Sequence, residues 1–252
     1  MLKPANIINP AIDEVLRAEA GRESFAGFAV VGQPFASGDV LCLRRFRTST
    51  IGPGYSAVWH RSPAGEWTVY TSIAPELSCP RFIGAAIARA VETPVELEWT
   101  GPAALSVRVP AAGLRWDMRV GSTPVTRLMN AMMALMPSFL YRSNLVLAVM
   151  SAMSTAMLAA GRFLMGGHMP NRQWFQVGPR RLWTISEARA SITGRDLGPV
   201  GPLAPQATIG GGPLPQRGLL MLGGVSFEAY VPGRHLPPTR AEIPRPSAVA
   251  TG

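Results

Sequence analysis

The sequence predicts a mainly β protein, an antiparallel barrel or sandwich, with a methionine-rich helical insert at about 123–161. The first observation is strict apolar/polar alternation between Val95 and Val120, which is typical of strands with one buried face. The second is an uncharged run from Ser143 to Gly161 that does not alternate. Because 47% of the residues are hydrophobic and only 15% are charged, the chain has enough apolar surface to fold compactly.

The length of 252 residues suits one large β domain. We therefore expect a single β-rich domain over 1–232, with the insert inside it, and a proline-rich C-terminal tail over 233–252. A short helix is expected from Asn9 to Gly21, because Asn-Pro precedes apolar residues at helical spacing and a glycine follows them.

Strands and one helix are predicted before the alternating region. Two strands lie within 25–47, and 55–61 and 67–73 form a hairpin around Ser-Pro-Ala-Gly, with His60 facing Trp67. Apolar residues at helical spacing predict an amphipathic helix over 79–91.

The alternating region predicts a three-stranded meander with a buried and a solvated face. The charged side chains on the solvated face have opposite signs, and each cross-strand pair stabilises the sheet by about 0.2–1 kcal/mol. The buried face is formed by Val95, Leu97, Trp99, Leu105, Val107, Val109, Leu114, Trp116, Met118 and Val120.

The pattern becomes helical after Ser122-Thr-Pro, which can cap a helix. Helices are expected over 127–136 and 143–161. Turn residues then separate short strands predicted at 162–167, 174–177, 182–186 and 190–193. A long Gly/Pro-rich connection follows over 198–218, and the last strand is expected over 219–230.

The run over 143–161 permits three interpretations. It is long enough to span a membrane, but Asn144, Ser151, Ser154 and Thr155 weaken that interpretation. A helix packed across the sheet is the plain alternative, and methionine-rich helices could also wall a hydrophobic cavity. A third option for the insert is a membrane-surface helix that uses Met129, Met132, Met133 and Met136, with arginines meeting anionic headgroups.

Charge and composition exclude several functions. The net charge of +9 comes from arginine, because Lys3 is the only lysine. Schiff-base, pyridoxal and P-loop chemistry each need a positioned lysine, so we do not expect them. The arginines are scattered rather than gathered in a stripe with aromatics, and we therefore expect no nucleic-acid partner.

Cysteine usage predicts a cytoplasmic protein. Cys42 and Cys79 are isolated, and the N-terminus lacks the apolar run of a secretory signal. Peripheral membrane contact and a homo-oligomer are left open. Zinc, dinucleotide and α/β-hydrolase motifs are absent, and His60, His168 and His235 are the only histidines. We therefore predict no metal and no cofactor.

His60 and Tyr70 are the candidate catalytic residues. His60 lies in the predicted hairpin among aromatic residues, where burial would shift its titration as acid/base catalysis requires. The alternative is a core histidine that is hydrogen-bonded to a neighbour. The candidate ligand-binding residues are Trp59, Trp67, Trp99, Trp116, Met150, Met153 and Met157.

Two segments carry a family resemblance, WHRSPAGEWTVY at 59–70 and FLMGGHMPNRQWFQVGPRRLWTIS at 163–186. They resemble the lipocalin-like (calycin) proteins related to carotenoid hydratases. This resemblance implies a cavity for an extended apolar or isoprenoid-like ligand and, in the enzymes, cofactor-free acid chemistry on a double bond. The chain departs from those enzymes in its shorter length, in the helical insert and in lacking their acidic pair.

The first functional hypothesis is therefore binding of a hydrophobic small molecule, such as an isoprenoid, polyketide or lipid, in a β-domain cavity. In its catalytic form the protein is a lyase or isomerase that hydrates, isomerises or cyclises this ligand without a cofactor. The alternative is a noncatalytic lipid-binding or membrane-associated protein, and a third is an oligomer whose methionine-rich helices form the interface.

Overall fold

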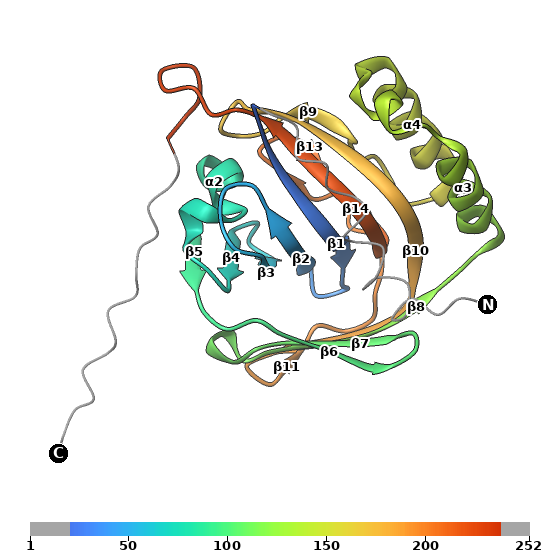
Figure 1. Ribbon diagram of the computed structural model, residues 1–252. Coiled ribbons are helices and arrows are strands. Elements are labelled where there is room, and N and C mark those ends of the chain that lie inside the picture. Colours follow the sequence, from blue (N-terminus) through green and yellow to red (C-terminus); the bar gives the residue numbers. More distant parts are fainter. Residues whose placement is uncertain (1–20, 238–252) are drawn as a thin grey trace.

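The computed structural model describes residues 21–237 and has a mainly β fold, as the sequence predicts (Figure 1). One curled sheet has the strand order β5-β4-β3-β2-β1-β14-β10-β8-β7-β6, with β9 and β11 also paired to β10. The helix expected from Asn9 and most of the expected C-terminal tail lie outside the described residues.

The structure has the following elements in chain order. The strands are β1 Arg22–Pro34, β2 Val40–Ser49, β3 Tyr55–Arg61, β4 Trp67–Thr71, β5 Arg89–Glu92, β6 Glu96–Gly101, β7 Ala104–Val109, β8 Leu114–Gly121, β9 Gly166–His168, β10 Trp174–Ile192, β11 Arg195–Asp196, β12 Thr208–Ile209, β13 Gly212–Pro213 and β14 Leu219–Glu228. The helices are η1 Pro75–Leu77, α2 Pro80–Ile83, η2 Gly84–Ala86, η3 Pro110–Ala112, α3 Pro124–Leu135, η4 Ser138–Arg142 and α4 Asn144–Leu158.

Strands β1 to β4 form the antiparallel hairpins that the sequence predicts, with one change of register. Arg61 pairs with Trp67, and His60 pairs with Thr68, so the expected pairing of His60 with Trp67 is wrong by one residue. The turn closes through the Ser62 and Glu66 backbone groups and therefore lets Trp67 begin β4 opposite the last residue of β3.

The helix predicted over 79–91 is largely wrong. Only α2 and η2 are helical there, and Arg89–Glu92 forms β5, which pairs in parallel with β4. The apolar spacing that suggested a helix instead places Phe82 and Ile83 on the sheet, while Ala90 and Val91 enter a strand. The backbone pairing with β4 comes from a distant part of the chain, so local periodicity did not reveal it.

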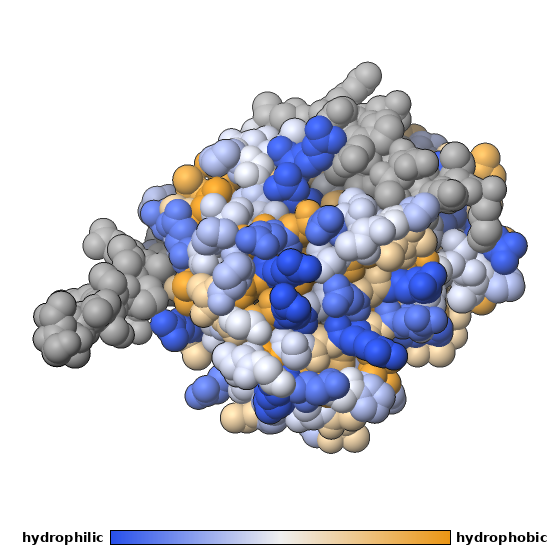
Figure 2. Space-filling view, turned by 90° about the horizontal axis from the view of Figure 1, so that it is seen from below, coloured by the Kyte–Doolittle hydropathy of each residue, from blue (hydrophilic) through white to orange (hydrophobic). Residues whose placement is uncertain are grey.

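The meander β6-β7-β8 is confirmed, and its faces are those expected. In β8 buried and exposed residues alternate along the strand. Figure 2 views the molecule from the side where Figure 1 shows this meander, and hydrophilic residues are spread over that surface. The opposite, apolar face packs inside the curl of the sheet.

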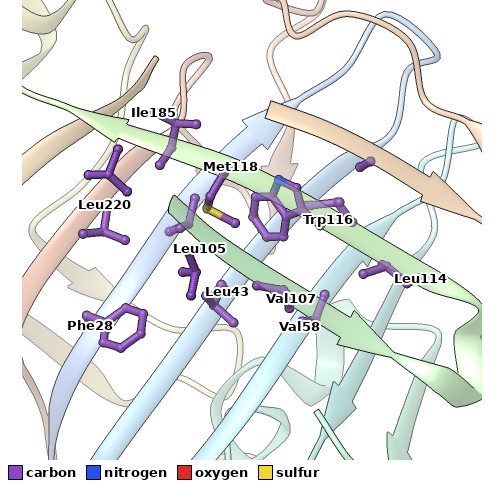
Figure 3. Packing of buried hydrophobic residues seen from close by; sticks show 14 of the residues in the cluster. Phe28, Leu43, Val58, Leu105, Val107, Leu114, Trp116, Met118, Ile185 and Leu220 are labelled. Atoms are coloured by element: carbon purple, nitrogen blue, oxygen red, sulfur yellow. The ribbon is translucent and has the colours of Figure 1, made fainter. Parts of the chain in front are cut away.

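The sheet curls so that the meander covers one face of β1, β2 and β3. Figure 3 shows Phe28, Leu43 and Val58 of these strands near Leu105, Val107 and Trp116 of the meander. We call this the inner core, which includes Phe28, Val30, Leu41, Leu43, Val58, Leu105, Val107, Leu114, Trp116, Ile185 and Leu222.

The other face of the same strands carries a second cluster. Because side chains alternate along a strand, Phe25 and Cys42 point away from the meander while their neighbours point toward it. We call this the outer core, which includes Phe25, Cys42, Phe46, Tyr55, Trp59, Trp67, Phe82, Ile83, Leu214 and Phe227.

Helices α3 and α4 lie between β8 and β9, where the sequence predicts helices. Thr123 caps α3 in a reciprocal capping box with Thr126, and Ser143 caps α4. Both helices lie along the outside of β10 (Figure 1). The cluster beneath them is the helix core, which includes Met129, Met133, Tyr141, Leu147, Met150, Leu158, Phe163, Met165, Leu182 and Leu219.

Within residues 21–237, no helix is both long and apolar enough to cross a membrane. The transmembrane interpretation of 143–161 therefore finds no support, because α4 ends at Leu158 and residue 159 already has a left-handed conformation.

A single bent strand replaces the three short strands predicted over 174–193. β10 runs for 19 residues and pairs first with β9 and β14 and later with β8. Irregular register near Pro179 and Ser186 lets it bend around the curled sheet. The turn residues Gly178 and Pro179, which separate two of the predicted strands, thus lie at a bulge of one strand. The strand expected over 162–167 is reduced to β9.

The connection over 198–218 is mostly irregular, as expected, with one small hairpin of β12 and β13. Gln206 and Gln216 fasten it by hydrogen bonds to the backbone of Arg162, Leu203 and Leu214. It therefore covers the outer core as an ordered layer. The last predicted strand is confirmed as β14, which ends at Glu228.

Candidate functional site

A cavity of about 200 Å³ lies between the outer core and the helix core. Strands β1, β10 and β14 form its floor, and α2, residues 163–170 and residues 209–214 surround it. Small residues at Gly27, Ala29 and Gly223 leave space above the floor. A Cβ at Gly27 would overlap the Arg45 carbonyl oxygen, so this position has no space for a side chain.

The cavity wall is almost entirely apolar. Only four of its side chains are titratable, namely Arg44, Tyr55, Cys79 and His168. His168 is exposed on β9 and packs edge-on against Trp174, with 4.8 Å between ring centroids. It therefore belongs to the rim, whereas the other three belong to the wall beside the outer core.

Arg44 is the one arginine among the described residues that line the cavity. It occupies an outer-face position of β2, and its guanidinium carbon lies 4.3 Å from the centroid of the Trp59 ring. Such a cation–π contact stabilises a positive charge beside an apolar surface. The local sequence explains the orientation, because Arg44 follows Cys42 by two residues and so faces the same side of the strand.

The hydrogen bonds of Arg44 leave part of its guanidinium available. Nη1 donates to the backbone oxygens of Val30 and Leu43, both at 2.9 Å. Within residues 21–237, Nε and Nη2 donate to no other residue, and no carboxylate lies within ion-pairing distance. Arg44 is half-buried, and a ligand that fills the apolar cavity would cover its guanidinium further. Because a covered cation is costly unless it is paired, this arrangement favours an anionic ligand.

Tyr55 and Cys79 form a buried pair next to this arginine. The Tyr55 oxygen and the Cys79 sulfur are 3.1 Å apart. Burial raises the pKa of both groups, although the charge of Arg44 opposes the shift. Both groups are therefore protonated at neutral pH. A protonated thiol is a weak nucleophile, so the pair is suited to shaping and polarising the wall rather than to covalent catalysis.

The Trp59 indole adds an unsatisfied donor to this wall. Its N–H lies close enough to the Cys79 sulfur to lower the thiol pKa, but without the geometry of a hydrogen bond. Among the described residues this nitrogen has no acceptor. Trp59 thus contributes an aromatic surface and a free N–H beside Arg44, and it is the one predicted ligand-binding tryptophan that lines the cavity.

A polar cluster holds α2 in place over the cavity. Arg81 of α2 donates from Nε and Nη2 to the two Glu23 carboxylate oxygens, at 3.0 and 2.6 Å. Gln173 also donates to Glu23, at 3.2 Å, and Asn171 donates to the Arg81 carbonyl. These bonds join β1, α2 and the segment just before β10, and thereby position the cavity residues Phe82 and Ile83.

The structure places His60 and Tyr70 on the inner face of β3 and β4, away from this cavity. His60 Nε2 lies 2.6 Å from Oδ1 of the fully buried Asp39, which also binds Arg195 at 3.0 and 3.2 Å. Burial would raise the pKa of Asp39, but the bonds from Arg195 and His60 outweigh it and lower that pKa.

Tyr70 packs against the inner core, and burial raises its pKa. His60 and Tyr70 share a face of the sheet but make no hydrogen bond with each other. Their catalytic roles stay predictions. The sequence analysis did not predict Arg44, Tyr55 or Cys79 as site residues. Arg44 could have been noticed, because it is an arginine on the apolar face of a predicted strand.

The remaining predicted ligand-binding residues are distributed over all three cores. Trp67 is in the outer core, where its indole donates to the Thr208 carbonyl at 3.0 Å. Trp99 and Trp116 belong to the inner core or pack against it. Met150 and Met153 line a gap of about 20 Å³ beneath the helices, and Met157 is half-buried outside both spaces. Ligand binding by these residues stays a prediction.

Within residues 21–237, no group of three or more His, Cys, Asp or Glu side chains could hold a metal ion. Residues 21–237 also contain no lysine, so an amine nucleophile is not available in the described part of the chain.

No family model matches the chain, and no curated protein matches it either. Among solved structures, the chain is similar to the crystal structure of acetoacetate decarboxylase from Legionella pneumophila subsp. pneumophila str. Philadelphia 1. The two share 12% identity with a TM-score of 0.38, over 87% of this chain and 93% of that one. This degree of likeness supports no inference about the site. The resemblance to carotenoid hydratases gains no support and stays a prediction.

Proposed function

We propose that this protein binds a small molecule with an apolar body and an anionic group in the cavity beside Arg44. The observation that carries the proposal is the guanidinium of Arg44, which faces an apolar cavity without a carboxylate partner among the described residues. A ligand carboxylate would supply that partner, and the apolar wall would bury the body of the ligand.

The chemistry of the wall favours an acidic lipid, isoprenoid or polyketide. Arg44 would accept a carboxylate through its free Nε and Nη2 donors, which have the planar geometry that matches two carboxylate oxygens. Protonated Tyr55 and Cys79 would remain uncharged beside the ligand. Catalytic hydration, isomerisation or cyclisation of the ligand stays part of the hypothesis, but the proposed binding does not depend on His60 or Tyr70.

Two probes with equal chains test the proposal, namely decanoate, which carries a carboxylate, and decanol, which is uncharged. We expect decanoate to bind the wild-type protein in isothermal titration calorimetry. Arg44→Met keeps an apolar stem over Trp59 but removes the charge, and should weaken decanoate binding by about 10- to 150-fold, the value of a charge-assisted hydrogen bond of about 1.5–3 kcal/mol. Decanol binding should change little.

Arg45→Met is the matched control, because Arg45 is the next residue of β2 and therefore points to the opposite face, where it donates to Ser56 at 3.2 Å. It should leave decanoate binding unchanged. Equal decanoate affinity in the wild-type protein and in Arg44→Met would refute the role of Arg44. Absence of binding by both probes would refute the cavity as a ligand site.

A further inference from the structure

Large apolar side chains are exposed on one region of the surface, formed by α3, η4, α4 and the segment to Leu164. Seven of the nine large apolar side chains that are exposed in the described chain belong to it. The exposed fraction is 85% for Leu135, 74% for Leu145 and 65% for Phe139. Exposed apolar residues scattered singly are ordinary, but a group of this kind marks an interaction surface.

The sequence of helix α4 accounts for the exposed apolar side chains. Leu147, Met150 and Leu158 face the sheet, whereas Leu145 and Val149 lie on the opposite side with exposed alanines. A helix at a protein–water interface normally turns charged residues outward. α4 has no charged residue at all, so its outward side is as apolar as a buried one.

Of the four methionines expected to touch a membrane, only Met132 is exposed on this surface. Met129 and Met133 are buried in the helix core, which corrects that part of the sequence prediction. In α3 the exposed large apolar side chains are Leu128, Met132 and Leu135, which recur at intervals of four and three residues and so form one stripe.

The charge around the apolar surface favours an anionic partner. The sequence has no acidic residue between Asp117 and Glu187, whereas this stretch contains seven arginines. Of these, Arg127, Arg142 and Arg162 are exposed and border the helices. A second copy of the chain would bring arginines against arginines, whereas anionic lipid headgroups would attract them.

We propose that the surface formed by α3, η4 and α4 docks on an anionic phospholipid bilayer, with its leucines, Phe139 and Val149 among the acyl chains and its arginines at the headgroups. This inference does not depend on the identity of the cavity ligand. Leu164 is exposed and also lines the cavity, so the docking surface is continuous with the cavity rim.

Flotation of the full chain with lipid vesicles tests the proposal. We expect binding to vesicles of phosphatidylglycerol and phosphatidylcholine in equal parts, weaker binding at high salt, and little binding to phosphatidylcholine alone. The double variant Leu145→Gln, Val149→Gln changes only exposed apolar positions, and should lower the partition coefficient at least about tenfold.

The matched control is Val200→Gln, Val231→Gln, which changes two exposed valines far along the chain from the helices and should bind like the wild type. Circular dichroism confirms that each variant is folded. Absence of binding to anionic vesicles, or equal binding by both double variants, would overturn the proposal. A stable dimer that the Leu145→Gln, Val149→Gln pair dissociates would also overturn it and assign the surface to a second copy.

Discussion

The guanidinium of Arg44 lies over the indole ring of Trp59, 4.3 Å from the ring centroid, at the wall of an apolar cavity. These residues are on neighbouring strands and on the same face of the sheet, since Cys42 pairs directly with Trp59. The aromatic ring holds the cation in an apolar environment without neutralising it. The guanidinium of Arg44 therefore has a fixed position and no carboxylate partner among the described residues. Recognition of a ligand carboxylate requires both.

Arg44→Lys tests the stacked geometry separately from the charge. An ammonium keeps the positive charge but lacks the planar group that stacks on Trp59 and binds two carboxylate oxygens. We expect decanoate affinity about two- to tenfold below that of the wild type, from the loss of about 0.5–1.4 kcal/mol, and above that of Arg44→Met. Calorimetric titration of the three proteins checks this order. Equal affinities of the Lys and Met variants would contradict it.

Ala29→Leu should close the cavity. Ala29 lies on its floor, so a larger side chain there would occupy the space of the ligand. Decanoate and decanol binding should both fall at least about tenfold, because the substitution excludes the apolar body common to both. Ala64→Leu, in the exposed β3–β4 turn, is the control and should bind normally. Retained binding by folded Ala29→Leu protein would place the ligand elsewhere.

The two cysteines should be inert in the folded protein. Burial raises the pKa of Cys42 to about 12 and also raises that of Cys79, so the reactive thiolate is scarce at pH 8. We expect no iodoacetamide adducts by intact mass spectrometry in buffer and two adducts per chain in urea. Rapid modification of one thiol without urea would show that the cavity wall opens, and peptide mapping would identify the residue.

The parts of the fold that depend on local alternation could be predicted from the sequence. The meander is the clearest case, because Trp116 and its even-numbered neighbours on β8 are apolar while the residues between them are charged. The parallel strand β5 could not be predicted, since its pairing with β4 depends on backbone contacts and the spacing of Ala86 and Ala90 also suits a helix.

The candidate site was predicted less well for a related reason. His60 and Trp59 are adjacent in sequence, yet successive residues of a strand point to opposite faces, so the two could not share one cavity. The same rule places Arg44 with Cys42 on the outer face. Leu164 and Leu214 belong to the segments that cover the cavity. Long-range contacts bring these segments there, and no local sequence pattern reveals such contacts.

Asp39 should make stability depend on pH in the acid range. Its pKa is lower in the folded protein than the ordinary value near 3.9, because Arg195 and His60 bind the carboxylate. A group with a lowered folded pKa stabilises the protein above its unfolded pKa, and this contribution is lost as the pH falls through the folded pKa. We therefore expect the free energy of unfolding to decrease below about pH 4.

Asp39→Asn removes this titration together with the ion pair. At pH 7 the variant should be less stable by about 1–3 kcal/mol, because a buried acceptor of charge-assisted hydrogen bonds is replaced by a neutral amide. The deficit should shrink as the pH falls from 4 toward 2 on urea titration, since the wild type loses the same interaction there. Asp117→Asn, on the exposed face of β8, is the control and should follow the wild-type curve. A deficit for Asp39→Asn that stays constant with pH would show that Asp39 contributes through packing rather than through its charge.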